Sequence, residues 1–298
     1  MTTKILRNIF LSLGVIVALA ITTHAQNLYV SVNGPLGAGQ GSISEYTPAG
    51  VQMTFTSGVI SEPRGLAFDS MGNLYAAITD AFPNHNTGKV VEFNPRTKPT
   101  AIGTATYYGT FEGVAIDAAG NVYVVTAGGR NSSTIFKFVP GISRSIFATN
   151  FVNGFDLAFD SAGNLYAADP GNQTIYKFTP NGTGTVFAGP GAFASGEGPT
   201  GLAFDSSGNL FVSTENNSGL EGTDAILEFT PAGMESTFAT GLTMPRGLAF
   251  DASGNLFVAL TRATPNGAIL KFAPGGGAAT VFASPIDRPE FLTFGPPR

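Results

Sequence analysis

Six residues that could carry chemistry precede copies of one short phrase in this sequence. Copies or variants of Gly-Leu-Ala-Phe begin at Gly65, Gly113, Asp156, Gly201, Gly247 and Phe291, and the residues just before them are Arg64, Glu112, Phe155, Thr200, Arg246 and Glu290. Arginine and glutamate at equivalent positions suit the recognition of carboxylates or sugars, because both groups make charge-assisted hydrogen bonds. Two interpretations stay open: these side chains form a ligand-binding mouth, or the opposite charges only neutralise one another. Phenylalanine supplies an apolar wall in either case.

The phrase belongs to a repeat, which predicts how these residues are positioned. Aspartates follow five of the copies, at Asp69, Asp117, Asp160, Asp205 and Asp251, with spacings of 48, 43, 45 and 46 residues. A period of about 45 residues is typical of one four-stranded propeller blade. A second phrase, of the type Ile-x-Lys-Phe, occurs six times, beginning at Ile43, Val90, Ile135, Ile175, Ile226 and Ile269.

The two ends of the repeat region complement each other. Asn27 begins NLYVSV, the second half of the first phrase, and Phe291 begins FLTFG, its first half. One blade is therefore split between the termini, so that a C-terminal inner strand pairs with N-terminal strands and closes the ring. The sequence predicts an all-β fold, a six-bladed β-propeller of four-stranded blades formed by a single domain over residues 26–298.

The repeated Asp-x-x-Gly-Asn step is typical of a tight turn. Aspartate accepts backbone N–H bonds at the first position, and glycine adopts positive φ at the fourth without strain. A calcium site in each turn is the alternative. One carboxylate per turn cannot supply the roughly six to eight oxygens that Ca²⁺ binds, so the turn interpretation is favoured.

The first 25 residues have the layout of an export signal. Lys4 and Arg7 precede an apolar run over residues 9–21, and Thr23-His24-Ala25 offers small residues for cleavage. We expect residues 1–25 to be a signal peptide rather than a membrane anchor, with export to a periplasm or outside the cell and no membrane span after its removal.

The charge and the cysteine content exclude some functions. Removal of Lys4 and Arg7 with the signal peptide changes the net charge from −5 to −7, which argues against nucleic acid as a partner. The absence of cysteine excludes disulfides and thiolate metal sites.

Two stretches carry a family resemblance. FDSAGNLYAADPGNQTIYKFTPNG, residues 159–182, resembles the NHL repeat, and GEGPTGLAFDSSGNLFVS, from Gly196, is similar to the gluconolactonase and senescence-marker lineage of calcium-dependent lactonases. The resemblance implies a metal held at the inner-strand entrances, and Glu197 matches the glutamate of that family. The other entrances read Arg-Gly, Glu-Gly, Thr-Gly and Arg-Gly, and two arginines repel a divalent cation. An intact family metal site is therefore not expected, and a calcium-dependent lactone hydrolase is the alternative function.

A second set of oxygen ligands could converge on neighbouring blades. It consists of Glu112, Asp156, Asp169 and Glu197, and such hard ligands would suit Ca²⁺ rather than a transition metal. The competing interpretation is that each carboxylate pairs with arginine or caps a loop. No other cofactor is predicted.

Known enzymatic signatures are otherwise missing. Apart from His24 in the expected signal, His85 is the only histidine, and the sequence shows no serine or aspartate partner that would make it a general base. We therefore predict an exported, monomeric propeller that binds a small polar ligand, or an extracytoplasmic protein or glycan, through its channel mouth. The alternatives are the calcium-dependent hydrolase and a structural module of an envelope or matrix.

Overall fold

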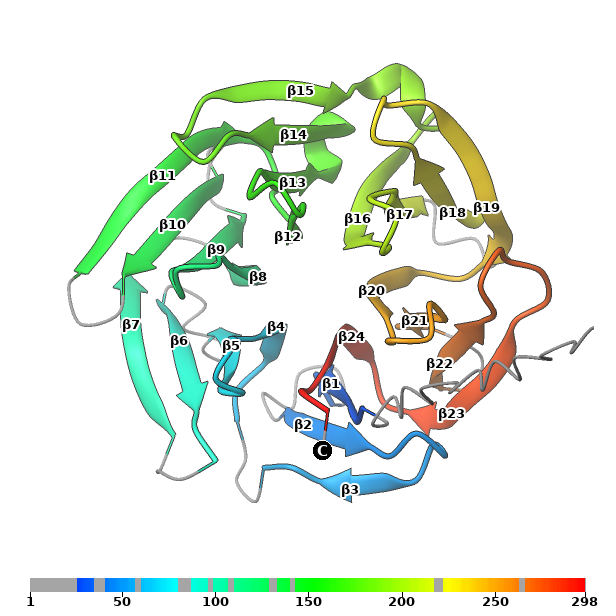
Figure 1. The fold of residues 1–298 in the computed structure, drawn as a ribbon, viewed down its shortest axis with the longest axis horizontal. Coiled ribbons are helices and arrows are strands. Elements are labelled where there is room, and N and C mark those ends of the chain that lie inside the picture. The colour runs from blue at the N-terminus through cyan, green and yellow to red at the C-terminus, as the bar shows by residue number, and fades with distance from the viewer. Residues whose placement is uncertain are drawn as a thin grey trace, which may run out of the picture.

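The protein is a ring of six antiparallel sheets arranged around a central axis (Figure 1). The computed structural model describes residues 26–34, 41–56, 60–79, 87–95, 99–106, 110–128, 133–139, 143–216, 222–262 and 266–297. Each sheet has four strands, which confirms the predicted six-bladed propeller. The expected signal peptide and His85 lie outside the described residues.

Five blades are built from consecutive strands. Blade 2 contains β4 (Pro63–Phe68), β5 (Leu74–Thr79), β6 (Thr87–Phe93) and β7 (Thr100–Thr106). Blade 3 contains β8 (Thr110–Ile116), β9 (Val122–Ala127), β10 (Ser133–Val139) and β11 (Ser143–Phe151). Blade 4 contains β12 (Leu157–Phe159), β13 (Leu165–Asp169), β14 (Thr174–Phe178) and β15 (Gly184–Ala188). Blade 5 contains β16 (Glu197–Phe204), β17 (Leu210–Asn216), β18 (Asp224–Phe229) and β19 (Glu235–Leu242). Blade 6 contains β20 (Pro245–Phe250), β21 (Leu256–Leu260), β22 (Gly267–Phe272) and β23 (Thr280–Ile286).

Blade 1 is the split blade that the repeat predicts. Its strands are β24 (Pro289–Phe294), β1 (Leu28–Val32), β2 (Ser42–Tyr46) and β3 (Gln52–Thr54). Leu28 lies opposite Phe294, and Val30 lies opposite Leu292, in an antiparallel pair. The inner strand of this blade therefore comes from one end of the chain and the other three strands from the other end.

Aromatic contacts explain why the phrase recurs in five of the six blades, whereas the inner strand of blade 3 ends in Ile116. The last residue of an inner strand packs edge-to-face on the aromatic residue of the second strand in the preceding blade. The pairs are Tyr29–Phe68, Tyr123–Phe159, Tyr166–Phe204, Phe211–Phe250 and Phe257–Phe294, with centroid distances of 4.9 to 5.2 Å. Blades thus bury their faces against one another, as stacked repeats must.

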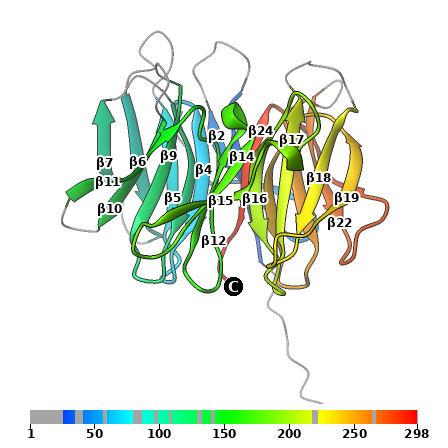
Figure 2. The same cartoon turned by 90° about the horizontal axis from the view of Figure 1, so that it is seen from above.

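The repeated aspartates cap the turns on one face of the ring. In blade 5, Oδ1 of Asp205 accepts the N–H groups of Ser207 and Asn209, and Oδ2 accepts the side-chain amide of Asn209. Asp69, Asp117, Asp160 and Asp251 make the same three contacts. The turns occupy the side of the ring where the chain ends, as Figure 2 shows, and the inner strands begin on the opposite side. We call that opposite side the mouth.

Among the residues that the structure describes, helical structure is confined to two short 3-10 turns, η1 (Pro170–Asn172) and η2 (Pro190–Ala192). Within the described part of the chain, no helix is long and apolar enough to cross a membrane.

Candidate functional site

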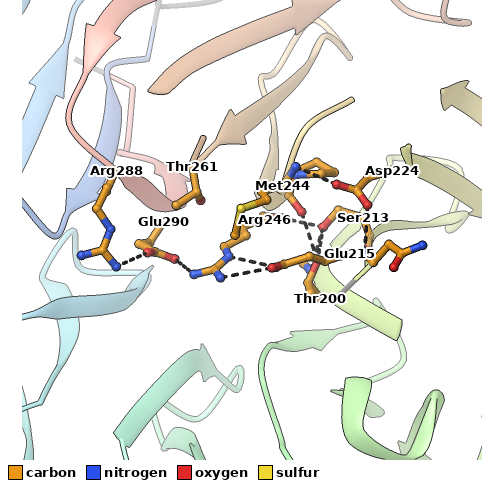
Figure 3. A network of polar contacts seen from close by, with 12 residues as sticks. Thr200, Ser213, Glu215, Asp224, Met244, Arg246, Thr261, Arg288 and Glu290 are labelled. Carbon is orange, nitrogen blue, oxygen red and sulfur yellow. Dashed lines mark hydrogen bonds and ion pairs between the residues drawn. The ribbon is translucent and has the colours of Figure 1, made fainter. Parts of the chain in front are cut away.

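Glu290 is the centre of a charged network at the mouth. Its side chain is fully buried on β24, between the arginines of neighbouring blades. Arg246 pairs with it through Nη1, Arg64 Nη1 lies 3.6 Å from Oε2, and Arg288 Nη2 lies 3.6 Å from Oε1. Figure 3 shows the chain of contacts from Arg288 through Glu290 and Arg246 to Glu215.

The network keeps Glu290 ionised. Burial acts to raise the pKa of its carboxyl group, but Arg246 and Arg64 outweigh burial and lower the pKa below the ordinary value. Asn33 also donates its side-chain amide to Oε1, at 3.2 Å. Since a carboxylate can only accept hydrogen bonds, this contact fixes the orientation of the Asn33 amide group.

All three guanidinium nitrogens of Arg246 have a carboxylate partner. Nε lies 3.1 Å and Nη2 3.4 Å from the two carboxylate oxygens of Glu215, while Nη1 contacts Glu290. Its guanidinium carbon also lies 5.3 Å from the ring centroid of Phe155, a cation–π contact. Burial opposes the charge, yet Glu290 and Glu215 raise the pKa of Arg246, so it stays a cation. We call Glu215 and Arg246 the closed side of the mouth.

Arg64 lies in blade 2 at the position that Arg246 occupies in blade 6, but its guanidinium group lacks such close carboxylate contacts. Strands β4 and β20 both read Pro-Arg-Gly-Leu-Ala-Phe. The nearest carboxylate oxygens of Glu62, Glu112 and Glu290 are 3.6 to 3.7 Å from Arg64, beyond good hydrogen-bond distance. Nε of Arg64 is buried without a hydrogen-bond partner in the described structure. Identical strands therefore place one saturated and one unsaturated arginine at the mouth.

The preceding blade places different residues beside the two arginines. Strands β1 and β17 share a register, because Ser31 and Ser213 each accept an inner-strand N–H, at 3.0 and 2.8 Å. Two residues further on, Asn33 in blade 1 corresponds to Glu215 in blade 5. Arg64 thus has a neutral amide in the preceding blade at the position where Arg246 has a carboxylate.

Three residues of this network each have a buried side-chain atom without a hydrogen-bond partner. The atoms are Oδ1 of Asn33, Nε of Arg64 and Oε2 of Glu112, and they are three of the four buried side-chain atoms without a partner in the described ranges. Asn33 is 2% and Glu112 4% exposed. Burial raises the pKa of Glu112, while Arg64 and the hydroxyl of Thr110 act to lower it. We call Asn33, Arg64 and Glu112 the open side of the mouth.

The two uncharged predicted residues have structural contacts. Phe155 stacks on Phe291 with centroids 5.6 Å apart and planes at 21°, so the two rings join opposite blades 4 and 1 across the channel (Figure 1). Thr200 donates to the carbonyl of Pro245, at 3.1 Å, and contacts Ser213. Thr200 therefore holds blades 5 and 6 together.

The four candidate metal ligands are engaged separately. Asp156 accepts the N–H groups of Leu157 and Leu202, and burial raises the pKa of Asp156 to about 7. Asp169 accepts the N–H groups of Val152 and Asn153 and caps η1.

The other two candidates also have partners of their own. Glu197 accepts the hydroxyl of Thr214, and Glu112 faces Arg64. Throughout the described ranges, no three His, Cys, Asp or Glu side chains form a group that could hold a metal. These residues therefore do not form a set that fits a calcium ion. Asp169 instead caps a loop and Glu112 lies beside an arginine, which are the roles given by the competing interpretation.

Sequence reasoning missed four mouth residues: Asn33, Glu62, Glu215 and Arg288. Asn33 directly follows β1 and Glu215 lies near the end of β17, and these strand ends face the mouth, so the strand register could have identified both residues. Glu62 and Arg288 lie two residues before Arg64 and Glu290, in the same entrances. The repeat identified one position per blade, whereas the network also contains residues on the adjacent strand and earlier in the same entrance.

Comparisons with solved structures agree with the fold. Virginiamycin B lyase from Staphylococcus aureus is 14% identical, with a TM-score of 0.61, and the match covers 91% of this chain and 94% of that one. A putative 6-phosphogluconolactonase from Bacteroides fragilis is also 14% identical, with a TM-score of 0.60 and coverage of 92% and 99%. A putative gluconolactonase is 15% identical, with a TM-score of 0.55 and coverage of 78% and 88%.

These neighbours include gluconolactonase-type propellers, as the sequence resemblance predicted. Identities this low show the shared fold alone. No family model matches the sequence, and no curated protein matches it.

Proposed function

We propose that this protein binds a small polar ligand at the open side of the mouth. The observation that supports the proposal is the set of three unpartnered polar atoms on Asn33, Arg64 and Glu112. Buried polar atoms without partners cost stability, so a ligand that supplies the missing hydrogen bonds gains favourable contacts there.

The alternative in which mouth charges only neutralise one another describes the closed side well. Each guanidinium nitrogen of Arg246 contacts a carboxylate oxygen of Glu215 or Glu290. Arg64 keeps an open Nε although it lies near three carboxylates. Ligand recognition is therefore assigned to Arg64 rather than to both arginines.

The test is to close the open side without changing Arg64. The Asn33→Glu variant places a carboxylate at the position that Glu215 occupies beside Arg246, so it should engage Arg64 and block the site. Asn181→Glu, on an exposed turn, adds the same charge elsewhere and serves as the control. A library of small polar compounds is screened by thermal shift and titration calorimetry.

We expect compounds that stabilise the wild type and the Asn181→Glu variant but not the Asn33→Glu variant. Binding that survives in Asn33→Glu would place the site elsewhere, and the absence of any binding compound would count against the proposal.

A calcium-dependent lactone hydrolase is the second candidate. The described neighbours support it, since two of them are named as putative lactonases. The separate partners of Glu112, Asp156, Asp169 and Glu197 count against a shared calcium site. Lactone hydrolysis with and without EDTA, in the wild type and in Glu197→Gln, separates the two functions, because only the hydrolase predicts chelator-sensitive turnover that Glu197→Gln abolishes.

Export through residues 1–25 remains part of the proposal. In that setting the ligand, or a protein or glycan that carries it, is extracytoplasmic, and the protein acts as a monomer. Cleavage after Ala25, measured by mass spectrometry of the protein recovered from its native compartment, tests this part.

A further inference from the structure

Three of the six blades place a lysine over the aromatic ring of the second strand. In each of them the lysine on the third strand lies directly opposite the aromatic residue in the strand register; the pairs are Tyr123–Lys137, Tyr166–Lys177 and Phe257–Lys271. The three Nζ atoms lie 5.0 to 5.2 Å from the ring centroids and 3.6 to 4.0 Å from Oδ2 of the turn aspartate in the same blade. Each ammonium group thus makes a cation–π contact and an ion pair together.

Blade 5 keeps the ring and the aspartate but lacks the lysine. Phe211 occupies the position of the ring, and Glu228 lies opposite it in the register. The turn aspartate, Asp205, makes the same turn hydrogen bonds as its counterparts. The rings of Phe211 and Phe250 have centroids 4.9 Å apart, in line with the ring pairs between the other blades. The walls of the ammonium position are therefore present in blade 5, and the ammonium group is not.

The two other blades with a glutamate at this position have a tyrosine ring. In blade 2, Tyr75 lies opposite Glu92, and its hydroxyl lies 3.3 Å from Oδ2 of Asp69. In blade 1, the hydroxyl of Tyr29 donates to Glu45, at 2.7 Å. A tyrosine hydroxyl or a lysine therefore contacts a carboxylate at this position in five blades, whereas the pair of blade 5 provides neither group.

A cavity lies at this position between blades 5 and 6. Its volume is about 290 Å³, and its lining includes Asp205, Phe211 and Phe250, together with the exposed residues Ser206 and Pro274. The corresponding cavity between blades 6 and 1, whose lining includes Lys271, measures about 220 Å³. The cavity without a lysine is thus the larger of the two. It opens on the side of the ring that carries the turns, opposite the mouth (Figure 2).

We propose that this cavity binds a primary alkylammonium group, which takes the place of the lysine that blade 5 lacks. The ammonium group pairs with Asp205 and lies over the ring of Phe211, while its alkyl chain packs against Phe238 and Phe250. An anion would meet the carboxylates of Asp205 and Asp251 in the lining, and a neutral molecule would gain neither the ion pair nor the cation–π contact. The site lies away from the mouth, so this inference is independent of the proposed function.

Small probes test the ligand class. Butylamine, a cation at neutral pH, has the length of a lysine side chain; butanol replaces its ammonium group by a hydroxyl, and butyrate carries the opposite charge. Binding to the full chain is measured by ligand-observed NMR, and the methyl signals of Leu256 and Ala273, which line the cavity, locate the site. We expect butylamine to bind at least about tenfold more tightly than butanol or butyrate.

A fourth probe identifies the source of the ammonium group. Nα-acetyl-lysine amide presents a lysine side chain as it occurs in a protein or peptide. Binding as tight as that of butylamine would support a lysine of a partner as the ligand, and weaker binding would support a free amine.

Variants assign the site. Glu228→Lys gives blade 5 the Phe–Lys pair of blade 6, so its own ammonium group should fill the cavity and weaken butylamine binding at least about tenfold. Glu235→Lys makes the same charge change at an exposed position of β19 outside the cavity lining and should leave binding unchanged.

The converse exchange should create a second site. Lys271→Glu gives blade 6 the Phe–Glu pair of blade 5, so butylamine should then also shift the methyl signals of Leu28, which lines the cavity between blades 6 and 1. This variant decides the matter if Glu228→Lys does not fold, because the absence of a second site would then count against the inference.

Butylamine that binds no better than butanol would overturn the ammonium assignment. Butylamine binding that Glu228→Lys leaves intact would place the site elsewhere and overturn the inference as well. Both results leave the proposed function at the mouth unaffected, since it is tested with Asn33→Glu.

Discussion

Replacing Glu290 by glutamine should destabilise the ring more than any other single charge removal at the mouth. The substitution keeps the shape of the side chain but leaves Arg246, Arg64 and Arg288 without their shared carboxylate. Removing one partner of a buried ion pair typically costs roughly 3 to 5 kcal/mol. The side chain of Glu62 is 20% exposed and pairs with Arg64 alone. The Glu62→Gln substitution should therefore lower the free energy of unfolding by at most about 1 kcal/mol.

The assay is urea unfolding of the wild type, Glu290→Gln and Glu62→Gln, repeated across pH. Glu290 has a pKa lowered in the folded state, so its contribution is present above the ordinary value of 4.5 and is lost as pH falls through the lowered value. The stability difference between the wild type and Glu290→Gln should therefore be constant near neutral pH and should shrink below pH 4.5.

Three results would refute this reasoning. Glu290→Gln could unfold at the same urea concentration as the wild type, or it could lose no more stability than Glu62→Gln. A stability difference that persists undiminished in strong acid would also show that ionisation of Glu290 is not its source.

Three further predictions concern the frame of the ring. Asp205→Ala should lower the free energy of unfolding by on the order of 1 kcal/mol through its lost turn contacts, and added calcium should not shift the thermal midpoint of the wild type; a calcium response that Asp205→Ala abolishes would contradict the turn assignment. Gly201→Ala should cost about 3 kcal/mol in chemical denaturation, because the new Cβ would lie 1.9 Å from the carbonyl oxygen of Arg246, whereas Gly191→Ala, with open space around it, should be neutral. Deleting residues 291–298 should remove cooperative thermal unfolding or sharply lower its midpoint, since β1 loses its inner partner, and an unchanged midpoint would rule out closure by β24.

The sequence predicted the ring because its repeat encodes packing directly. Each phenylalanine that ends an inner strand meets an aromatic ring of the preceding blade, and each turn aspartate caps its own turn. Such contacts involve the same positions in successive units, so one period and two phrases suffice to infer blade number and closure. The split blade followed from the complementary ends at Asn27 and Phe291 for the same reason.

The mouth could be predicted only in part, because its contacts depend on differences between blades. The repeat located Arg64, Arg246 and Glu290 at equivalent entrances, and the structure brings them together. It could not show that Arg246 is saturated and Arg64 is not, since that depends on Glu215 and Asn33 in other strands. The proposed convergence of Asp156 with three other carboxylates likewise depended on side-chain directions that a one-dimensional pattern does not contain.

The identical strands β4 and β20 also bear on how such a ring acquires or changes specificity. Two copies of one strand can therefore hold arginines with different hydrogen bonding, because one neighbouring strand supplies a carboxylate and the other an amide. Motif searches that score the strand would assign both copies the same role. Engineering an arginine with an open donor into blade 6 should accordingly begin at Glu215, outside the repeated phrase, rather than at Arg246 itself.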